Sequence, residues 1–185
     1  MAKVHPEITP DLANWISEQA MYFLASAPLT ETGHVNVSPR GVHSLHILDS
    51  KHVLLLDLTG SGNETAAHIA ENSRLTVMFC AFTGKPKILR LYGGAESILP
   101  DHPEWMTLRD KFPQGIAGVR QLFRLNIKRV QTSCGFGVPL MDFVAQRELL
   151  TEWSSKRSEQ EMSEYRQNKN AVSIDGYTIP INSSK

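Results

Sequence analysis

A polar loop between an apolar run and a helical pattern carries residue types suited to binding an anion. The run 53–56 leads into Asp57-Leu-Thr-Gly-Ser-Gly-Asn-Glu-Thr65, and a helical pattern follows over 65–71. Glycines let backbone N–H groups approach an oxyanion, hydroxyl groups add O–H donors, and a helix N-terminus adds unpaired N–H groups with a partial positive charge. The pattern therefore predicts a phosphate or a similar anion close to Thr59, Ser61 and Thr65.

The same loop also has a purely structural interpretation. Asn63 or Thr65 would cap the helix that follows, and Gly60 and Gly62 would only make the turn. The loop sequence alone leaves both interpretations open.

Two arginines on expected strands add positive charge that an anion site needs. Arg40 lies in Asn36-Val-Ser-Pro-Arg-Gly41, where a proline and a glycine interrupt regular pairing. Its guanidinium would contact phosphate oxygens, with Ser38 as a further donor, or would be a solvated loop side chain. Arg90 lies inside a strand-like run, where a charged side chain either faces solvent or is buried with a partner.

The histidines and cysteines form no recognisable metal or nucleophile motif. His43 and His46 are three residues apart on an expected strand and would face opposite sides of it. The two cysteines lack metal-ligand spacing, and we expect Cys80 to be a buried reduced thiol. A glycine-rich turn around Cys134 is expected to place Phe136 against a neighbour or a ligand. We expect no metal site, and no catalytic acid or base can be assigned.

Composition restricts the classes of partner. The chain has 185 residues, 41% of them hydrophobic, and its 19 basic side chains balance 19 acidic ones. A neutral chain has no long-range attraction for nucleic acid or for an anionic membrane, so we expect neither as a partner. No apolar stretch approaches the roughly 20 residues of a membrane span, and the first residues do not resemble a signal peptide. The expected location is the cytoplasm.

The spacing of apolar runs predicts a mainly β fold. A capped amphipathic helix is expected after Thr9-Pro10, and the expected strands are 21–25, 35–37, 44–48, 53–58, 75–82, 88–99 and 122–130. Hairpin signals occur at Gly33, at 49–51 and at 84–86, which favours antiparallel pairing. Closely spaced strands with few helices indicate a barrel rather than a doubly wound sheet.

The sequence pattern changes from strand-like runs to a helical period near Val144. Residues 148–153 follow a helical period, and Ser158-Glu-Gln-Glu161 is a capping-box signal for a second helix that reaches about Asn168. An extended or hairpin element is expected over 174–181. We therefore predict a barrel domain over 1–143 and, over 144–185, an appendage packed on the barrel or on a dimer partner.

Four segments taken together identify a family resemblance. They are Asn36-Val-Ser-Pro-Arg-Gly41, Asp57-Leu-Thr-Gly-Ser-Gly-Asn-Glu-Thr65, Arg74-Leu-Thr-Val-Met-Phe79 and Leu89-Arg-Leu-Tyr-Gly-Gly-Ala-Glu96. In order and spacing they resemble the pyridoxamine 5'-phosphate oxidase-like family of flavin-binding split barrels. The later segments 133–139 and 173–176 resemble an uncharacterised branch of that family.

The resemblance implies a six-stranded antiparallel split barrel that forms a homodimer and holds FMN in a cleft at the dimer interface. The positions that it assigns to the cofactor are Ser38, Arg40, Thr59, Gly60, Ser61, Asn63, Thr65 and Arg90. At the helix start the oxidase itself has a basic pair for the FMN phosphate, whereas this chain has Asn63-Glu64-Thr65. The end of the chain also lacks a match to the part of the oxidase that helps hold pyridoxamine phosphate.

The expected function is therefore an FMN-dependent oxidoreductase of unknown substrate, and not synthesis of pyridoxal phosphate. The alternative is a non-catalytic protein that holds a flavin, a heme or another phosphorylated ligand on the same barrel. A third possibility, a partner-binding module whose C-terminal helices make the contacts, needs no ligand.

Overall fold

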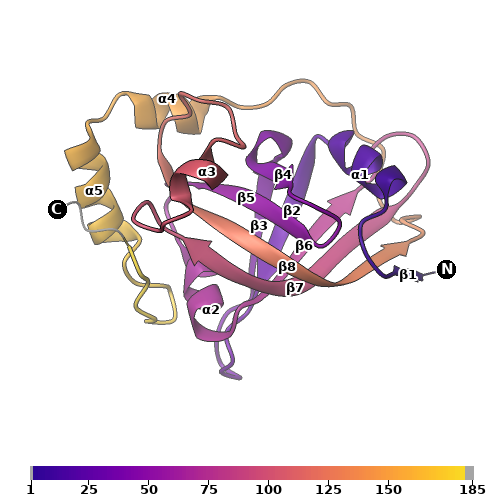
Figure 1. Cartoon of the computed structure of the whole chain (residues 1–185), viewed down its shortest axis with the longest axis horizontal. Coiled ribbons are helices and arrows are strands. Elements are labelled where there is room, and N and C mark those ends of the chain that lie inside the picture. The colour runs from indigo at the N-terminus through magenta and orange to yellow at the C-terminus, as the bar shows by residue number, and fades with distance from the viewer. Residues whose placement is uncertain (1, 182–185) are drawn as a thin grey trace.

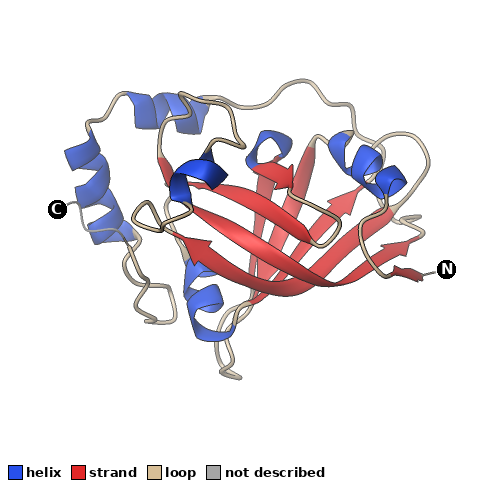
Figure 2. Ribbon diagram, in the orientation of Figure 1, coloured by secondary structure: helices blue, strands red, loops and turns tan. Residues whose placement is uncertain are grey.

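Antiparallel strands form one strongly curved sheet, as Figure 1 and Figure 2 show. The computed structural model describes residues 2–181, and within them the strands are β1 (Lys3–His5), β2 (Met21–Ser26), β3 (Asn36–Gly41), β4 (Leu45–Ile47), β5 (His52–Leu58), β6 (Arg74–Cys80), β7 (Ile88–Ile98) and β8 (Val119–Ser133). Their order across the sheet is β3-β2-β6-β7-β8-β5-β4, and β1 pairs with β8.

The two edges of the sheet meet at a turn in the chain. The edge strands β3 and β4 are consecutive in sequence and are joined by the 3₁₀ turn η1 (Val42–Ser44), so the sheet must curl back on itself. The buried Tyr22 on β2 holds this turn, because its hydroxyl donates to the Ser44 carbonyl oxygen over 3.1 Å. The result is a split barrel whose opening lies between its edge strands, β3 and β4.

Helices cover the barrel at several places, as Figure 2 shows. They are α1 (Pro10–Ser17), α2 (Glu64–Asn72), α3 (Trp105–Arg109), α4 (Leu149–Ser155) and α5 (Glu159–Lys169). The side chain of Thr9 caps α1 as expected, and Ser158 and Glu161 form the expected capping box of α5. None of the helices in the described part of the chain is long and apolar enough to cross a membrane.

The sheet is buried on both faces around β5. Val53 and Leu55 pack inside the barrel with α1 and α2, whereas Leu54 and Leu56 pack on the outer face against α3. A strand with two buried faces needs apolar residues at consecutive positions, which accounts for the uninterrupted run Val53-Leu-Leu-Leu56. Asp57 is the charged residue at the end of this buried strand.

The chain after β8 wraps along the outside of the barrel. Residues 134–148 have no helix or strand and lead to α4, which Figure 1 shows in orange, and α5 then turns back towards α2. After α5 the chain makes a hairpin-like turn closed by the bridge between Val172 and Thr178. This turn falls in the region for which an extended or hairpin element was predicted.

The predicted mainly β barrel is confirmed. Each of the seven predicted strands has a counterpart, and the hairpins at Gly33, 49–51 and 84–86 join antiparallel pairs. Six strands are long, and the sheet is extended by β1 and β4, which have three residues each. The prediction missed β1, and it placed Ser44 on a strand although that residue ends the 3₁₀ turn η1. A strand of three residues is too short to show a recognisable strand pattern in the sequence.

Candidate functional site

A hollow of about 820 Å³ lies at the opening of the barrel. Its walls come from β3, from η1, from the end of β5, from the loop after β5, and from the segment that leads into α4. The lining residues are Asn36, Ser38, Pro39, Arg40, Gly41, His43, Ser44, Leu56, Leu58, Gly60, Ser61, Gly62, Asn63, Glu64, Thr65, Pro113, Ile116, Arg120, Gln146, Arg147, Glu148, Leu150 and Thr151. The volume is in the range of sites that hold small organic ligands.

Three charged side chains from three strands meet beside this hollow. Arg40 of β3 places Nη2 2.8 Å from Oδ1 of Asp57 on β5, and Arg120 of β8 places Nη2 2.8 Å from Oδ2 of the same carboxylate. The Asp57 side chain is 1% exposed and the Arg120 side chain 4%. Both arginines line the hollow, whereas Asp57 does not.

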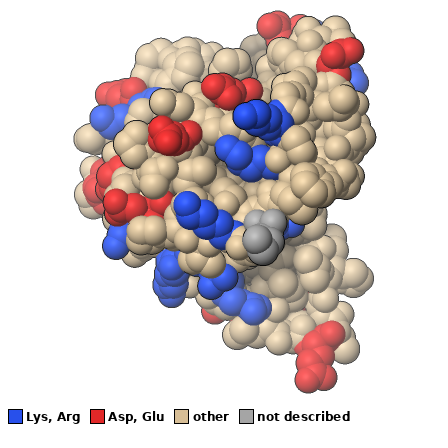
Figure 3. Space-filling view, turned by 90° about the vertical axis from the view of Figure 1, so that its right-hand side faces the viewer, with Lys and Arg blue, Asp and Glu red and all other residues tan. Residues whose placement is uncertain are grey.

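Two guanidinium groups share one carboxylate, so this cluster carries a net positive charge. Glu64, Arg147 and Glu148 also line the hollow. On the face that Figure 3 presents, Lys and Arg side chains gather in a central band, and most of the Asp and Glu side chains lie to the left of it and above it. The chain is neutral overall. The planar guanidinium fork of an arginine suits a phosphate or a carboxylate.

The environment of Asp57 keeps its carboxyl group ionised. Burial by itself raises the pKa of Asp57, but the charges of Arg120 and Arg40 and the hydrogen bonds from Gln121 and Arg120 outweigh it, so the pKa is lowered. Gln121 Nε2 donates to Asp57 Oδ2 over 2.8 Å and to Asn63 Oδ1 over 2.9 Å. This buried amide therefore connects the charged cluster to the loop that precedes α2.

The start of α2 faces the hollow without a side-chain cap. Asn63 occupies the N-cap position but its side chain makes no capping hydrogen bond, because its Oδ1 accepts from Gln121 instead. The capping role for Asn63 in the structural interpretation of the loop is therefore wrong. The uncapped first turn leaves backbone N–H groups and the positive end of the helix dipole beside Gly60, Ser61 and Thr65.

Six of the eight residues predicted to contact a cofactor share the hollow. They are Ser38, Arg40, Gly60, Ser61, Asn63 and Thr65. One hydrogen bond ties β3 to α2, because Asn36 Nδ2 on β3 donates to Thr65 Oγ1 over 3.0 Å. Within β3, Ser38 Oγ donates to Asn36 Oδ1 over 3.3 Å. The strand and the helix start are thus directly linked.

The other two predicted residues do not line the hollow. Thr59 is fully buried behind the loop, where its Oγ1 accepts from Arg166 Nε over 3.0 Å. Arg90 is on β7, and its Nη1 donates to Ser133 Oγ over 3.3 Å. The strand order explains the position of Arg90, because β7 is separated from β3 by two strands and from β5 by one.

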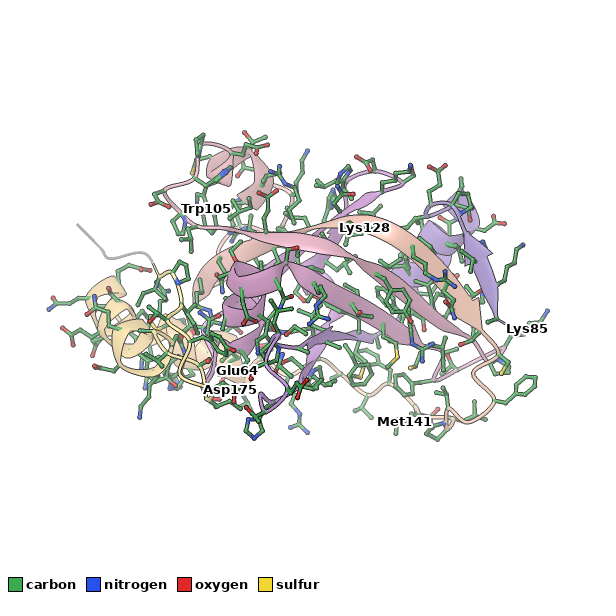
Figure 4. The ribbon with its side chains drawn as sticks, turned by 90° about the horizontal axis from the view of Figure 1, so that it is seen from below. Glu64, Lys85, Trp105, Lys128, Met141 and Asp175 are labelled. Carbon is green, nitrogen blue, oxygen red and sulfur yellow. The ribbon has the colours of Figure 1, made fainter. Side chains whose placement is uncertain are left out.

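Glu64, which replaces a basic residue of the oxidase pattern, is engaged by the C-terminal turn. Both of its carboxylate oxygens accept from the Ile174 backbone N–H over 3.2 Å. Figure 4 shows Glu64 beside Asp175, close to the C-terminal turn. The Glu64 carboxylate therefore has a hydrogen-bond donor in the C-terminal turn, although the Glu64 side chain still borders the hollow.

Sequence reasoning missed the residues that complete the charged cluster, which are Asp57, Arg120 and Gln121. A signal was present for one of them, since a lone acid at the end of an otherwise apolar strand must have a partner. Arg120 and Gln121 precede the apolar run 122–123, where nothing in the sequence distinguishes them from ordinary strand-end residues. His43, which was expected on a strand, lies in the 3₁₀ turn η1 and borders the hollow.

Comparisons with known proteins agree with this architecture. A family model described as pyridoxamine 5'-phosphate oxidase matches residues 8–134. The pyridoxamine 5'-phosphate oxidase family protein ustO of Aspergillus flavus is 34% identical over 190 residues, which cover 93% of this chain and 75% of ustO.

Solved structures resemble the fold at low sequence identity. A variant of HupZ from Group A Streptococcus has a TM-score of 0.57 and 17% identity, and the match covers 68% of this chain and 99% of that one. A FAD-binding protein of Mesorhizobium loti has a TM-score of 0.50 and 16% identity, covering 71% of this chain and 96% of that one. At such identities the likeness shows a shared fold.

Proposed function

Because this chain belongs to the pyridoxamine 5'-phosphate oxidase family, we propose that it binds FMN in the hollow and acts as an FMN-dependent oxidoreductase. The single observation that carries the proposal is the pair of guanidinium groups, Arg40 and Arg120, that share the one carboxylate of Asp57 at the wall of the hollow. The proposal includes a homodimer and a cytoplasmic location. Its substrate is a small molecule that remains to be identified by assay.

The residues present fit the cofactor. The phosphate would meet Arg40, the backbone of Gly60 and Ser61, and the uncapped start of α2, which replace the positive charge that Asn63-Glu64-Thr65 lacks. The apolar side chains of Leu56, Leu58 and Ile116 line another part of the hollow and suit an aromatic ring system.

A bound flavin would supply the transfer of a hydride or an electron pair, and the protein would supply position and charge. Arg40 would contact and neutralise the phosphate, and the buried Arg120 would add positive charge from behind it. The hydrogen bond from Asn36 to Thr65 links β3 to the start of α2, and Ser38 donates to Asn36 within β3. The segment that carries Gln146 and Arg147 also lines the hollow, where it would limit the access of water to a bound flavin.

Replacing Arg40 tests the assignment of the phosphate site. We expect Arg40→Ala to weaken FMN binding by about 2 to 5 kcal/mol, the range for truncating one partner of a buried charged hydrogen bond. Arg120 keeps Asp57 paired in this variant, so the barrel should still fold. Titration of the apoprotein with FMN, followed by flavin fluorescence, measures the change.

Arg129→Ala is the matched control, because Arg129 is an exposed arginine of β8 that contacts Gln131 and does not line the hollow. Equal FMN affinities of the two variants would remove Arg40 from the site. The absence of flavin absorption bands in the purified protein, together with no binding of added micromolar FMN by the wild type, would end the FMN proposal.

The catalytic part of the proposal needs a separate experiment. Anaerobic mixing of the FMN-loaded protein with NADH, NADPH and a panel of other reductants should bleach the flavin absorption with at least one of them. A flavin that binds tightly but stays oxidised across the panel would identify a carrier of FMN instead of an oxidoreductase.

A further inference from the structure

The C-terminal turn and α5 hold the proposed phosphate loop from the side opposite the hollow. Asn170, which directly follows α5, is completely buried, and its Nδ2 donates to the Gly60 carbonyl oxygen over 3.0 Å. A longer contact of 3.5 Å runs in the other direction, from Asn63 Nδ2 to the Asn170 carbonyl oxygen. Neither Asn170 nor α5 lines the hollow.

Arg166 makes a second attachment one turn earlier on α5. Its Nε donates to Thr59 Oγ1 over 3.0 Å, and its Nη2 donates to the Val119 carbonyl oxygen over 3.3 Å. Thr59 begins the loop, and its own backbone N–H donates to the Gly118 carbonyl oxygen over 2.8 Å. Arg166 therefore links the base of the loop to the start of β8.

The end of the loop is held by the same C-terminal segment. Glu64 accepts from the Ile174 N–H, and Asp175 accepts from both the backbone N–H and Nδ1 of His34 over 2.8 and 2.7 Å. Three positions of the loop thus contact residues between 166 and 174: Thr59, Gly60 and Glu64.

The loop is also held from the side of the sheet, where Arg120 Nη1 donates to the Gly62 carbonyl oxygen over 3.1 Å and Gln121 Nε2 donates to Asn63 Oδ1 over 2.9 Å. The contacts from the C-terminal region matter because the glycines give the loop little intrinsic preference for one shape. Gly60 and Gly62 have no side chains, and a Cβ at Gly60 would meet no atom within 4 Å. A glycine-rich loop free in solution samples many backbone conformations, and a ligand that must order it loses affinity by that entropy. Contacts that order the loop beforehand raise affinity without touching the ligand.

We propose that Asn170 and Arg166 are positioning residues that fix the loop 59–64 in the shape that receives the phosphate of the ligand. This inference rests on the proposed function for its ligand, whereas the ordering of the loop is a property of the protein alone. The C-terminal region is thereby part of the binding device and more than an appendage on the barrel.

The decisive experiment measures the loop in the ligand-free protein. We expect Asn170→Ala to raise hydrogen exchange of the backbone amides in residues 59–64 by roughly tenfold, which corresponds to about 1.4 kcal/mol. Asn168→Ala is the matched control, because Asn168 is an exposed asparagine two positions earlier on α5. FMN affinity should fall by a similar factor in Asn170→Ala and stay at the wild-type value in Asn168→Ala.

Two substitutions of Thr59, the residue of the loop that accepts the hydrogen bond from Arg166, cover the case in which Asn170→Ala does not fold. Thr59→Val removes the acceptor oxygen at nearly constant shape, and Thr59→Ser restores it. Fast exchange of the loop in the valine variant and near wild-type exchange in the serine variant is the expected result, with chemical denaturation showing that overall stability is similar in the two.

The outcomes separate the two proposals. The positioning role would be overturned if the hydrogen-exchange rates of residues 59–64 were the same in Asn170→Ala and Asn168→Ala. Equal rates in Thr59→Val and Thr59→Ser would overturn it as well. Selective loosening of the loop combined with no FMN binding by the wild type would support the positioning role and refute FMN as the ligand. If the wild type binds FMN and a variant with a loosened loop binds it with the same affinity, the link between loop order and binding would be overturned.

Discussion

At the scale of single residues, the most demanding feature of this protein is a buried carboxylate with two guanidinium partners. Removing charges from water is costly, and a buried ion pair repays that cost only with good geometry and additional hydrogen bonds. Asp57 has both, since Arg40 and Arg120 approach to 2.8 Å and Gln121 donates a further hydrogen bond. Arg40 remains 21% exposed, which leaves one guanidinium accessible from the hollow.

We expect Asp57→Asn to destabilise the fold by about 3 to 5 kcal/mol at neutral pH, because it leaves buried positive charge without its counterion. The folded-state pKa of Asp57 lies below the unfolded value of about 3.9. The stabilisation is therefore complete above that pH and is lost as the pH falls through the folded-state pKa.

Urea denaturation between pH 3 and pH 8 checks this prediction. The difference in free energy of unfolding between wild type and Asp57→Asn should be constant at neutral pH and should shrink below about pH 4. Asp142→Asn, which alters an exposed carboxylate, should stay within about 0.5 kcal/mol of the wild type. A difference that is independent of pH down to pH 3 would contradict the ionised state of Asp57.

At the scale of elements, the site depends on how separate segments converge on the start of α2. Strand β5 delivers Asp57 to the base of the loop, β3 supplies Arg40 from the other side of the barrel opening, and β8 supplies Arg120. The packing of α4 against the start of β8 completes this arrangement. Gly118, immediately before β8, has a positive φ of 77°, and a Cβ there would overlap the Ser154 side chain on α4.

Gly118→Ala should therefore be destabilising for two reasons, whereas Gly115→Ala has only one. Both glycines have a φ of +77°, but a Cβ at Gly115 would meet no atom within 4 Å. We expect a loss of about 1 to 2 kcal/mol for Gly115→Ala from the backbone conformation, and a further ~1 to 3 kcal/mol for Gly118→Ala from overpacking. Thermal unfolding measures both, and equal losses would show that α4 yields without cost.

At the scale of the whole molecule, the segment between β8 and α4 is unusually apolar for an exposed chain. Phe136, Leu140 and Val144 are 82%, 81% and 94% exposed. A turn is present at Gly135, as predicted, but Phe136 contacts no core of its own chain. Exposed apolar side chains gathered on one segment favour an interaction site, which is consistent with the proposed homodimer.

We expect sedimentation equilibrium to give a mass of twice the 20.7 kDa chain. Leu140→Asp combined with Val144→Asp should shift the protein towards the monomer, because two charges would be buried in the interface. Met106→Asp on α3, at a residue that is 69% exposed, is the control and should leave the dimer intact. A wild-type protein of single-chain mass at micromolar concentration would refute the homodimer.

Local signals in the sequence were sufficient for most elements. The capping residues Thr9 and Ser158 mark the starts of α1 and α5, and the apolar run of β5 indicates a strand buried on both faces. The glycines and hydroxyls of the loop after β5 predict an anion site there, and Gly60, Ser61 and Thr65 of this loop line the hollow. Of the predicted cofactor positions, Thr59 and Arg90 do not line the hollow, because facing directions and strand order are set by pairing between distant residues.

The amino-acid sequence by itself determined the mainly β class, the hairpin sites, the family and the loop that carries the candidate site. Periodicity, caps and turn residues are local properties, so they can be read along the chain. Only the tertiary structure decided that Arg120, 63 positions from Asp57, shares its carboxylate, and that Asn170 contacts Gly60. Contacts of this separation follow from sheet order and chain path, which no local pattern encodes.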